Sequence, residues 1–175
     1  MNNKTQIRIF IVEDNKLFAL ALKTDIETAF ANIPCKIFLF ETGEMCMEKF
    51  KEEKPQIVIL DYHLNSSDSE AANGIKVLDR IIKEYNETNV IMLTRDDDID
   101  IAIKAFKHGA SDFIIKTDTQ FRKIIFSLFN LFRLIKSKKE ALRYKRITIV
   151  LCLSVAILVG VAIAIQAFYP SLFVR

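Results

Sequence analysis

Short apolar runs alternate with longer amphipathic segments along the first two thirds of the chain. The runs are five or six residues long and several are rich in β-branched residues, as the buried strands of a parallel sheet are. Strands that alternate with helices predict an α/β fold, in which helices cover a parallel sheet on both faces. The expected strands are Ile7–Val12, Lys36–Phe40, Gln56–Asp61, Asn89–Leu93 and Ser111–Lys116.

The segments between these runs begin and end as helices do. Asn15 is a candidate N-terminal cap, Pro34 and Pro55 close the first two units, and Gly109 is a C-terminal stop. The expected helices are Lys16–Ala31, Glu41–Lys54, Gly74–Tyr85, Asp97–His108 and one that starts near Asp118. In the first of them, the residues at helical spacing are Leu17, Leu20, Ala21, Thr24 and Ala31.

The last helical pattern continues far beyond the length that such a domain needs. Its apolar stripe, from Phe121 to Ile135, enters a basic segment, residues 133–146, with seven Lys or Arg and one Glu. Residues 147–169 carry no charge, and 23 helical residues span about 34 Å against a hydrocarbon core of about 30 Å. We interpret this stretch as a transmembrane helix; the alternative is a buried hairpin or a dimer helix.

The expected division is a globular domain at 5–132, a basic juxtamembrane helix at 133–146, the span at 147–169 and a short tail at 170–175. The net charge of +3 conceals an asymmetry: residues 1–132 hold 17 basic and 21 acidic side chains, and residues 133–175 hold eight and one. Basic residues before the span predict that the domain lies on the cytoplasmic side.

The position of the basic segment next to a span favours anionic lipid over nucleic acid as its partner. The mildly acidic domain gives no indication of nucleic-acid binding.

The cysteines and the N-terminus indicate the cellular compartment of the domain. Cys35, Cys46 and Cys152 lack the spacing of a metal site, and we interpret them as free thiols in a reducing compartment. The first residues run directly into a strand pattern and contain no signal-peptide apolar region.

Polar residues follow four of the expected strands. Glu13 and Asp14 follow the first, Asp61 ends the third, Thr94 follows the fourth and Lys116 ends the fifth. The carboxyl ends of parallel strands meet at one edge of a sheet, so we expect these groups to gather there. Asp14 and Asp61 would offer oxygen ligands to Mg²⁺, and without a metal the acids should raise the pKa of at least one carboxyl group. The Lys116 ammonium and the Thr94 hydroxyl suit phosphoryl oxygens.

Together these residues resemble the response-regulator receiver domain over residues 5 to 132. That family has an acidic pair after its first strand, a phosphoacceptor Asp after its third, a Thr or Ser after its fourth and a Lys after its fifth. An aromatic residue stands three positions before that Lys, and Phe113 matches it. The resemblance implies a flavodoxin-like sheet of order 2-1-3-4-5 and phosphorylation of Asp61 by a histidine kinase or histidine phosphotransfer protein. It also implies that the His63 backbone carbonyl binds Mg²⁺, that Glu13 acts through water, and that Thr94 and Phe113 form a switch.

The sequence departs from the family pattern at three places. The loop after Asp61 reaches Gly74 some five residues late, with the additional residues drawn from Asn65 to Asn73. Thr117 stands where Pro usually follows the Lys, and a cis bond before a non-Pro residue costs about 2.5 to 4 kcal/mol, so we expect a trans or differently shaped turn. Arg95 stands where a small residue often follows the Thr, and its long side chain would alter access to the site.

Two other features have ordinary interpretations. The lone imidazole of His63 on a polar loop is more often solvated than catalytic. The acidic run Asp96–Asp100 lacks the spacing of a calcium loop, and a helix N-terminus favours such acids.

We interpret the chain as a membrane-anchored, single-domain response regulator in the bacterial cytoplasmic membrane, a signalling phosphoacceptor without a DNA-binding output domain. The alternative is a phosphorylation-independent interaction module of the same fold. An enzyme for a separate small substrate lacks a further catalytic set. Small residues at Ala156, Gly160 and Ala164 would allow a parallel homodimer, although such residues are also common in membrane helices.

Overall fold

The structure, a computed structural model, describes residues 6–64, 74–95 and 99–168, and for residues 162–168 the backbone only. Its five strands form one parallel sheet in the order β2-β1-β3-β4-β5. The expected fold class and strand order are therefore confirmed. The strands are β1 (Ile7–Val12), β2 (Cys35–Phe40), β3 (Ile57–Asp61), β4 (Asn89–Thr94) and β5 (Asp112–Ile115).

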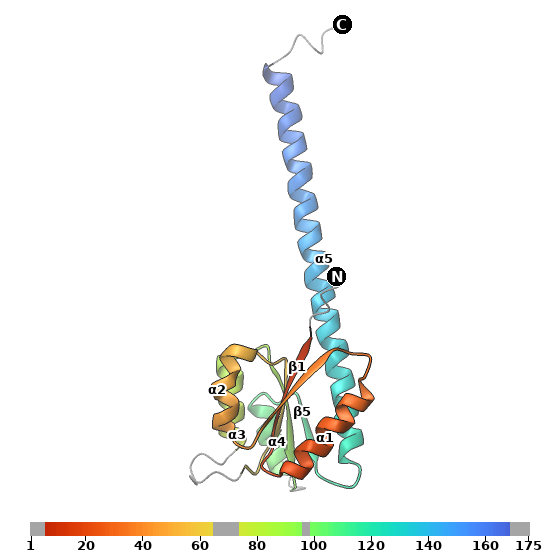
Figure 1. Ribbon diagram of the computed structural model, residues 1–175. Coiled ribbons are helices and arrows are strands. Elements are labelled where there is room, and N and C mark those ends of the chain that lie inside the picture. The colour runs from red at the N-terminus through yellow and green to blue at the C-terminus, as the bar shows by residue number, and fades with distance from the viewer. Residues whose placement is uncertain (1–5, 65–73, 96–98, 169–175) are drawn as a thin grey trace. The chain divides into compact units, whose positions relative to one another are not determined.

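Helices connect the strands and cover the sheet on both faces (Figure 1). Asn15 caps α1 as expected, because its Oδ1 accepts a hydrogen bond from the Phe18 N–H at 3.1 Å. The α1 helix ends at Ala29, two residues before the expected end, and the expected start of α4 at Asp97 lies outside the described residues. The helices are α1 (Lys16–Ala29), α2 (Gly43–Glu53), α3 (Gly74–Glu84), α4 (Ile99–Lys107) and α5 (Gln120–Phe168).

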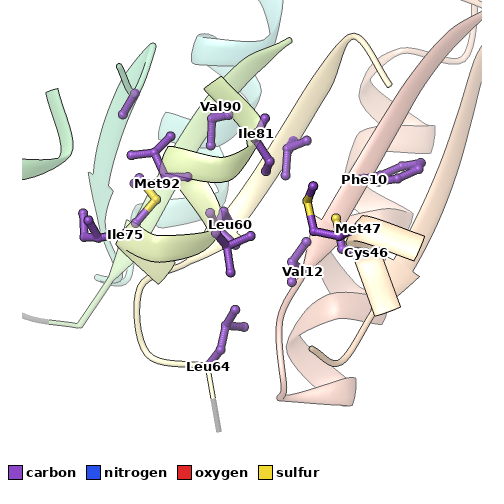
Figure 2. Close-up of a cluster of buried hydrophobic side chains, with 14 of the residues drawn as sticks. Phe10, Val12, Cys46, Met47, Leu60, Leu64, Ile75, Ile81, Val90 and Met92 are labelled. Atoms are coloured by element: carbon purple, nitrogen blue, oxygen red, sulfur yellow. The ribbon is translucent and has the colours of Figure 1, made fainter. Parts of the chain in front are cut away.

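Alternate residues of the central strands point to opposite faces of the sheet. On one face Phe10, Leu60 and Met92 belong to a buried cluster that α2 and α3 cover, and Figure 2 shows their side chains together with Met47 and Ile81 of these helices. On the other face, the buried residues of the central strands include Ile9, Ile11, Ile59 and Ile91. Burial on both faces explains why the strands are continuous apolar runs instead of alternating ones.

The apolar face of α1 differs from the expected one. The side chains of Leu17 and Leu20 are 81% and 53% exposed, and Ala21, Thr24 and Ala31 are also exposed. The helix instead buries a second stripe at helical spacing, Ala19, Leu22 and Ile26. Both stripes are apolar, so periodicity alone does not distinguish them, and the direction in which the capped helix leaves β1 decides which one meets the sheet.

The chain divides into two compact units, residues 1–131 and 132–175. The α5 helix begins in the first unit, where Ile124 and Leu128 are buried, and continues into the second. By length and composition it could cross a membrane: its apolar window has a mean hydropathy of 1.9 and is not buried in protein. A long apolar C-terminal helix is thus present as expected. The tail at 170–175 lies outside the described residues.

Truncation of Leu22 should destabilise the domain far more than truncation of Leu20. Leu22 is fully buried, so Leu22→Ala leaves a cavity and should cost about 2–5 kcal/mol, whereas Leu20→Ala on the exposed stripe should cost less than about 0.5 kcal/mol. Pulse proteolysis in urea, on the full chain in detergent micelles, measures both. Equal losses would contradict the orientation of α1.

Candidate functional site: an acidic pocket at the carboxyl edge of the sheet

Residues from three strand ends meet at the carboxyl edge of the sheet. The Lys116 Nζ donates hydrogen bonds to Glu13 Oε2 at 2.6 Å and to Asp61 Oδ2 at 2.7 Å. These residues follow β1 and β5 and end β3, and they are up to 103 positions apart in sequence. The strand order makes the contact possible, because β1 and β3 are neighbours at the centre of the sheet.

The three charged groups are almost completely removed from water. Glu13 is 1% exposed, Asp61 is 2% exposed and the Lys116 side chain is 8% exposed. Burial raises the pKa of Glu13, and the charge of Asp61 raises it further, while the hydrogen bond from Lys116 lowers it. The expectation that one carboxyl group of the cluster has a raised pKa is met by Glu13, although burial contributes more than repulsion does.

Asp14 completes an oxygen-rich cluster. One carboxylate oxygen from each of Glu13, Asp14 and Asp61 lies within 4.8 Å of the others. Carboxylates at this spacing suit a small hard cation such as Mg²⁺, which needs only one or two of them and keeps several waters. The residues present therefore fit a divalent metal. The backbone of His63 is also close, since its N–H donates to Asp61 Oδ1 at 3.3 Å; a role for its carbonyl as ligand stays a prediction.

Backbone contacts hold the loops of this edge in place. The Asn15 N–H donates to Glu13 Oε1 at 3.4 Å, so the residue that caps α1 also orients the buried carboxylate. The Tyr62 N–H donates to the Leu93 carbonyl at 2.7 Å, which ties the residue after Asp61 to β4. These bonds fix the start of each loop to the rigid sheet.

Gly74 is required by a close approach to the backbone next to the phosphoacceptor candidate. A Cβ on this residue would lie 2.5 Å from the Asp61 carbonyl oxygen and 2.9 Å from the Tyr62 Cα. Its N–H donates to the Tyr62 carbonyl at 3.1 Å, so α3 starts directly against this loop. The lengthened segment Asn65–Asn73 that precedes it lies outside the described residues.

Thr94 ends β4, and Phe113 lies on the neighbouring edge strand β5. Thr94 is completely buried, and its carbonyl accepts a hydrogen bond from the Lys116 N–H at 2.6 Å. Phe113 is partly buried and packs against the apolar cluster on the α2–α3 face. No cis peptide bond occurs among the described residues, so the turn at Lys116–Thr117 is trans, as expected without a proline.

An aromatic wall beside Lys116 was not found from the sequence. The Lys116 Nζ lies 4.9 Å from the ring centroid of Phe18 in α1, and that ring stacks on Phe121 of α5 with centroids 5.3 Å apart. A cation over an aromatic face is attracted to it, so Phe18 helps to hold the ammonium in position. The contact joins three elements distant in sequence, and no local motif reveals it.

A small cavity opens next to this wall. It has a volume of about 290 Å³, and its lining includes Glu13, Lys116, Phe18, Arg95 and Gln120. Arg95, whose long side chain is expected to alter access to the site, thus lies beside the pocket residues. Gln120 Oε1 is buried there without a hydrogen-bond partner among the described residues. The acidic residues 96–98 that follow Arg95 lie outside the described residues.

This arrangement, a parallel α/β sheet with buried acids and a lysine at its carboxyl edge, defines a class of phosphoacceptor domains. Residues 9–125 match the family described as the response regulator receiver domain. The chain belongs to this family. Receiver domains are signalling phosphoacceptors that bind Mg²⁺ at their acidic pocket and interact with histidine kinases or phosphotransfer proteins.

Relatives with known names share the receiver part of the chain. The chemotaxis protein CheY of Thermotoga maritima is 30% identical over 109 residues, which cover 62% of this chain and 84% of that protein. The transcriptional regulatory protein DegU of Brevibacillus brevis is 24% identical over 120 residues, 65% of this chain and 45% of DegU. The chain thus spans less than half of the length of the first curated relatives that it matches.

Solved structures agree with the fold. The signal receiver domain of a LuxO repressor protein from Vibrio parahaemolyticus superposes with a TM-score of 0.65 at 27% identity, over 77% of this chain and 95% of that one. A CheY-like receiver domain protein from Methanospirillum hungatei gives a TM-score of 0.64 at 19% identity, over 78% of this chain and 99% of that one, which shows the fold alone.

The raised pKa of Glu13 predicts how stability depends on pH when no metal is bound. The folded state holds the Glu13 proton more tightly than the unfolded state does, so the free energy of unfolding should fall as pH rises above 4.5 and through the raised pKa. Glu13→Gln cannot ionise and should remove this component. Urea unfolding of the full chain with a chelator, from about pH 5 to about pH 7.5, measures the slope. An equally steep slope in the variant would show that another group is responsible.

Proposed function

We propose that Asp61 accepts a phosphoryl group from a phosphohistidine of a histidine kinase or histidine phosphotransfer protein. The observation that supports this most directly is the Lys116 ammonium, which contacts both Asp61 and Glu13 inside a buried acidic cluster. A carboxylate repels an incoming phosphoryl group, and a fixed cation at bonding distance offsets that repulsion. Without Lys116 the same acids would oppose the reaction.

The proposed transfer has a simple balance of bonds. An oxygen of the Asp61 carboxylate attacks phosphorus, an O–P bond forms, and the P–N bond to the donor imidazole breaks. The electron pair of that bond stays on the imidazole nitrogen. Lys116 stabilises charge on a phosphoryl oxygen, and the His63 N–H holds the other carboxylate oxygen of Asp61 in place.

The cation of the family fits this site. Asp14 and Asp61 would hold Mg²⁺, Glu13 would act through water, and the His63 carbonyl would complete the set, as the resemblance implies. When bound, the metal supplies positive charge against the phosphoryl oxygens. The contribution of this chain is to keep the three acids close together, with Glu13 and Asp61 buried, before the cation arrives.

A switch at Thr94 and Phe113 belongs to the same proposal. The Thr94 side chain is buried at the end of β4, the strand next to β3, so its hydroxyl lies one strand away from Asp61. Movement of that hydroxyl toward a phosphoryl group would open space beside β5, where Phe113 is only partly buried. The ring would then turn inward and change the surface of the domain.

Replacement of Asp61 should abolish acid-stable, base-labile labelling. The full chain in detergent micelles, with acetyl phosphate and Mg²⁺, should take up one phosphoryl group, and Asp61→Asn should take up none. Asp25→Asn is a matched control, because Asp25 lies on the exposed side of α1 away from the pocket. Intact-mass spectrometry with alkaline treatment measures the label. Equal labelling of Asp61→Asn would refute the assignment, and a wild-type chain that takes up no label would favour the phosphorylation-independent module.

We further propose that residues 147–169 anchor the receiver to the bacterial cytoplasmic membrane and that residues 133–146 contact anionic lipid headgroups. The apolar side chains of this helix are exposed in the structure over the part whose side chains are described, for example Leu151, Ile157 and Val159. So much exposed apolar surface on one helix requires a cover, and a bilayer provides it. Output would then come from the receiver surface at the membrane. Pairing of two copies through Ala156 and Gly160 stays a prediction.

Membrane insertion predicts a specific extraction behaviour. High salt and alkaline carbonate should leave the wild-type chain in the membrane pellet, because apolar burial is insensitive to both, whereas detergent should release it. The double variant Leu153→Arg and Leu158→Arg should move to the soluble fraction, and Lys138→Gln with Lys139→Gln serves as a control outside the span. Release of the wild-type chain by salt alone would show that only the basic segment binds.

A further inference from the structure

A second pocket lies at the amino ends of the strands, on the edge of the sheet opposite Asp61. Its volume is about 450 Å³, and the residues that carry its chemistry are Arg8, Lys54, Gln56, Tyr85, Glu87 and Thr88. Arg8 is the second residue of β1, while Gln56 and Thr88 immediately precede β3 and β4. We call this the amino-edge pocket, and neither the phosphoacceptor chemistry nor the anchor uses it.

Arg8 has an unsatisfied buried donor in this pocket. Its Nε is buried and has no hydrogen-bond partner among the described residues, and its guanidinium makes no ion pair there. A buried donor without an acceptor costs more than an ordinary hydrogen bond contributes, so such groups are few in folded proteins. Arg8 as a whole is partly exposed and lines the pocket, so a turn of its guanidinium would present donors to an anion that enters.

The backbone around Arg8 is fixed, so the guanidinium is presented from a rigid base. The Arg8 N–H donates to Gln56 Oε1 at 2.9 Å, and the Gln56 N–H donates back to the Arg8 carbonyl at 3.0 Å. The Gln56 side-chain amide also donates to the Lys54 carbonyl at 2.9 Å. These bonds connect the two basic residues of the pocket through a single glutamine.

Lys54 adds a second positive charge. It caps the C-terminus of α2 in the left-handed conformation, with φ of 44°, which turns the chain sharply toward β3. Its side chain is exposed and makes no ion pair with the described residues. Thr88 is not free to bind a ligand, because its hydroxyl donates to the Pro55 carbonyl at 2.9 Å. The charge available to a ligand therefore comes from Arg8 and Lys54.

We propose that the amino-edge pocket binds a phosphate-bearing anion, with the Arg8 guanidinium and the Lys54 ammonium as its cationic contacts. Arginine presents a planar set of donors that matches phosphate, and lysine adds a mobile point charge. The pocket volume falls in the range of small-molecule sites, so it has room for an organic group beside the phosphate.

Glu87 restricts the organic part of the ligand. It is the one carboxylate among the described residues that line the pocket, and it makes no hydrogen bond or ion pair with the part of the chain that the structure describes. A carboxylate near the phosphate subsite favours a ligand with hydroxyl groups, which donate to it, and disfavours a second anionic group. A phosphorylated polyol meets both conditions, whether it is a free metabolite or the headgroup of a phospholipid.

The test follows two signals of the pocket by NMR. The sample is the full-length Asp61→Asn variant in neutral micelles. The substitution and a chelator prevent phosphate from binding at the acidic site. The probe is glycerol 3-phosphate. The Nε–H signal of Arg8, identified by its loss in Arg8→Lys, and the side-chain amide signal of Gln56 should shift and saturate together. Micelles doped with phosphatidylglycerol, whose headgroup is a phosphate ester of glycerol, form the second arm: saturation only there assigns the site to lipid, and saturation with the soluble probe assigns it to a free phosphate ester.

Variants decide whether the two cations bind the probe. The dissociation constant, followed at Gln56, should rise about tenfold in Arg8→Gln and by a smaller factor in Lys54→Gln, since each change removes a charge-assisted contact. Lys51→Gln, which removes an exposed charge of α2 outside the pocket, should leave the constant unchanged. No saturable shift in either arm, or equal affinity in Arg8→Gln, would overturn the proposal. Failure of Asp61 phosphorylation would not affect it, because the experiment excludes that site.

Discussion

One buried contact, the Lys116 ammonium between the carboxylates of Glu13 and Asp61, governs the arrangement of this protein. Two carboxylates cannot be desolvated together at low cost, and an ammonium within 2.7 Å of both compensates that cost only if all three are held in position. The sheet provides this restraint, because the three residues extend from strands whose own hydrogen bonds are fixed. Loops of ordinary flexibility could not hold the three groups at these distances.

The core on both faces of the sheet follows from the same requirement. To keep the charges at their ends away from water, the central strands must be covered on both faces of the sheet. Their residues are therefore apolar throughout, and helices pack against both faces. Gly74 shows how closely the covering helix approaches, since a single Cβ there would clash with the Asp61 carbonyl. On the opposite side, Phe18 places α1 against the ammonium, and Phe121 of α5 stacks on the Phe18 ring. The position of α5 is therefore coupled to the acidic pocket at its first turn.

The sequence was sufficient for the fold and for most of this pocket because both depend on strand ends. Apolar runs of fixed length show where each strand stops, and parallel order then places Glu13, Asp61 and Lys116 at one edge. The face of α1 was predicted wrongly, because Leu17 and Leu20 form as regular a stripe as Ala19, Leu22 and Ile26. Phe18 and Arg8 were missed for another reason: their significance comes from neighbours far away in sequence, and only the packed structure brings an ammonium over a ring or leaves a guanidinium nitrogen without an acceptor.

Charge in the acidic pocket gives a reason for the proposed switch. With Glu13, Asp14 and Asp61 ionised and Lys116 protonated, three negative charges face one positive charge, an excess of two that a divalent cation would balance. Conversion of the Asp61 carboxylate into an acyl phosphate adds about one further negative charge to a site where Glu13 and Asp61 are already buried. The ionised acids have no donor to offer, and the Lys116 ammonium, which already contacts two carboxylates, has one N–H left for a phosphoryl oxygen. Thr94, buried on the adjacent strand, is the nearest neutral group of the predicted set that can donate to another, and its movement would transmit the charge change to the aromatic residue of β5.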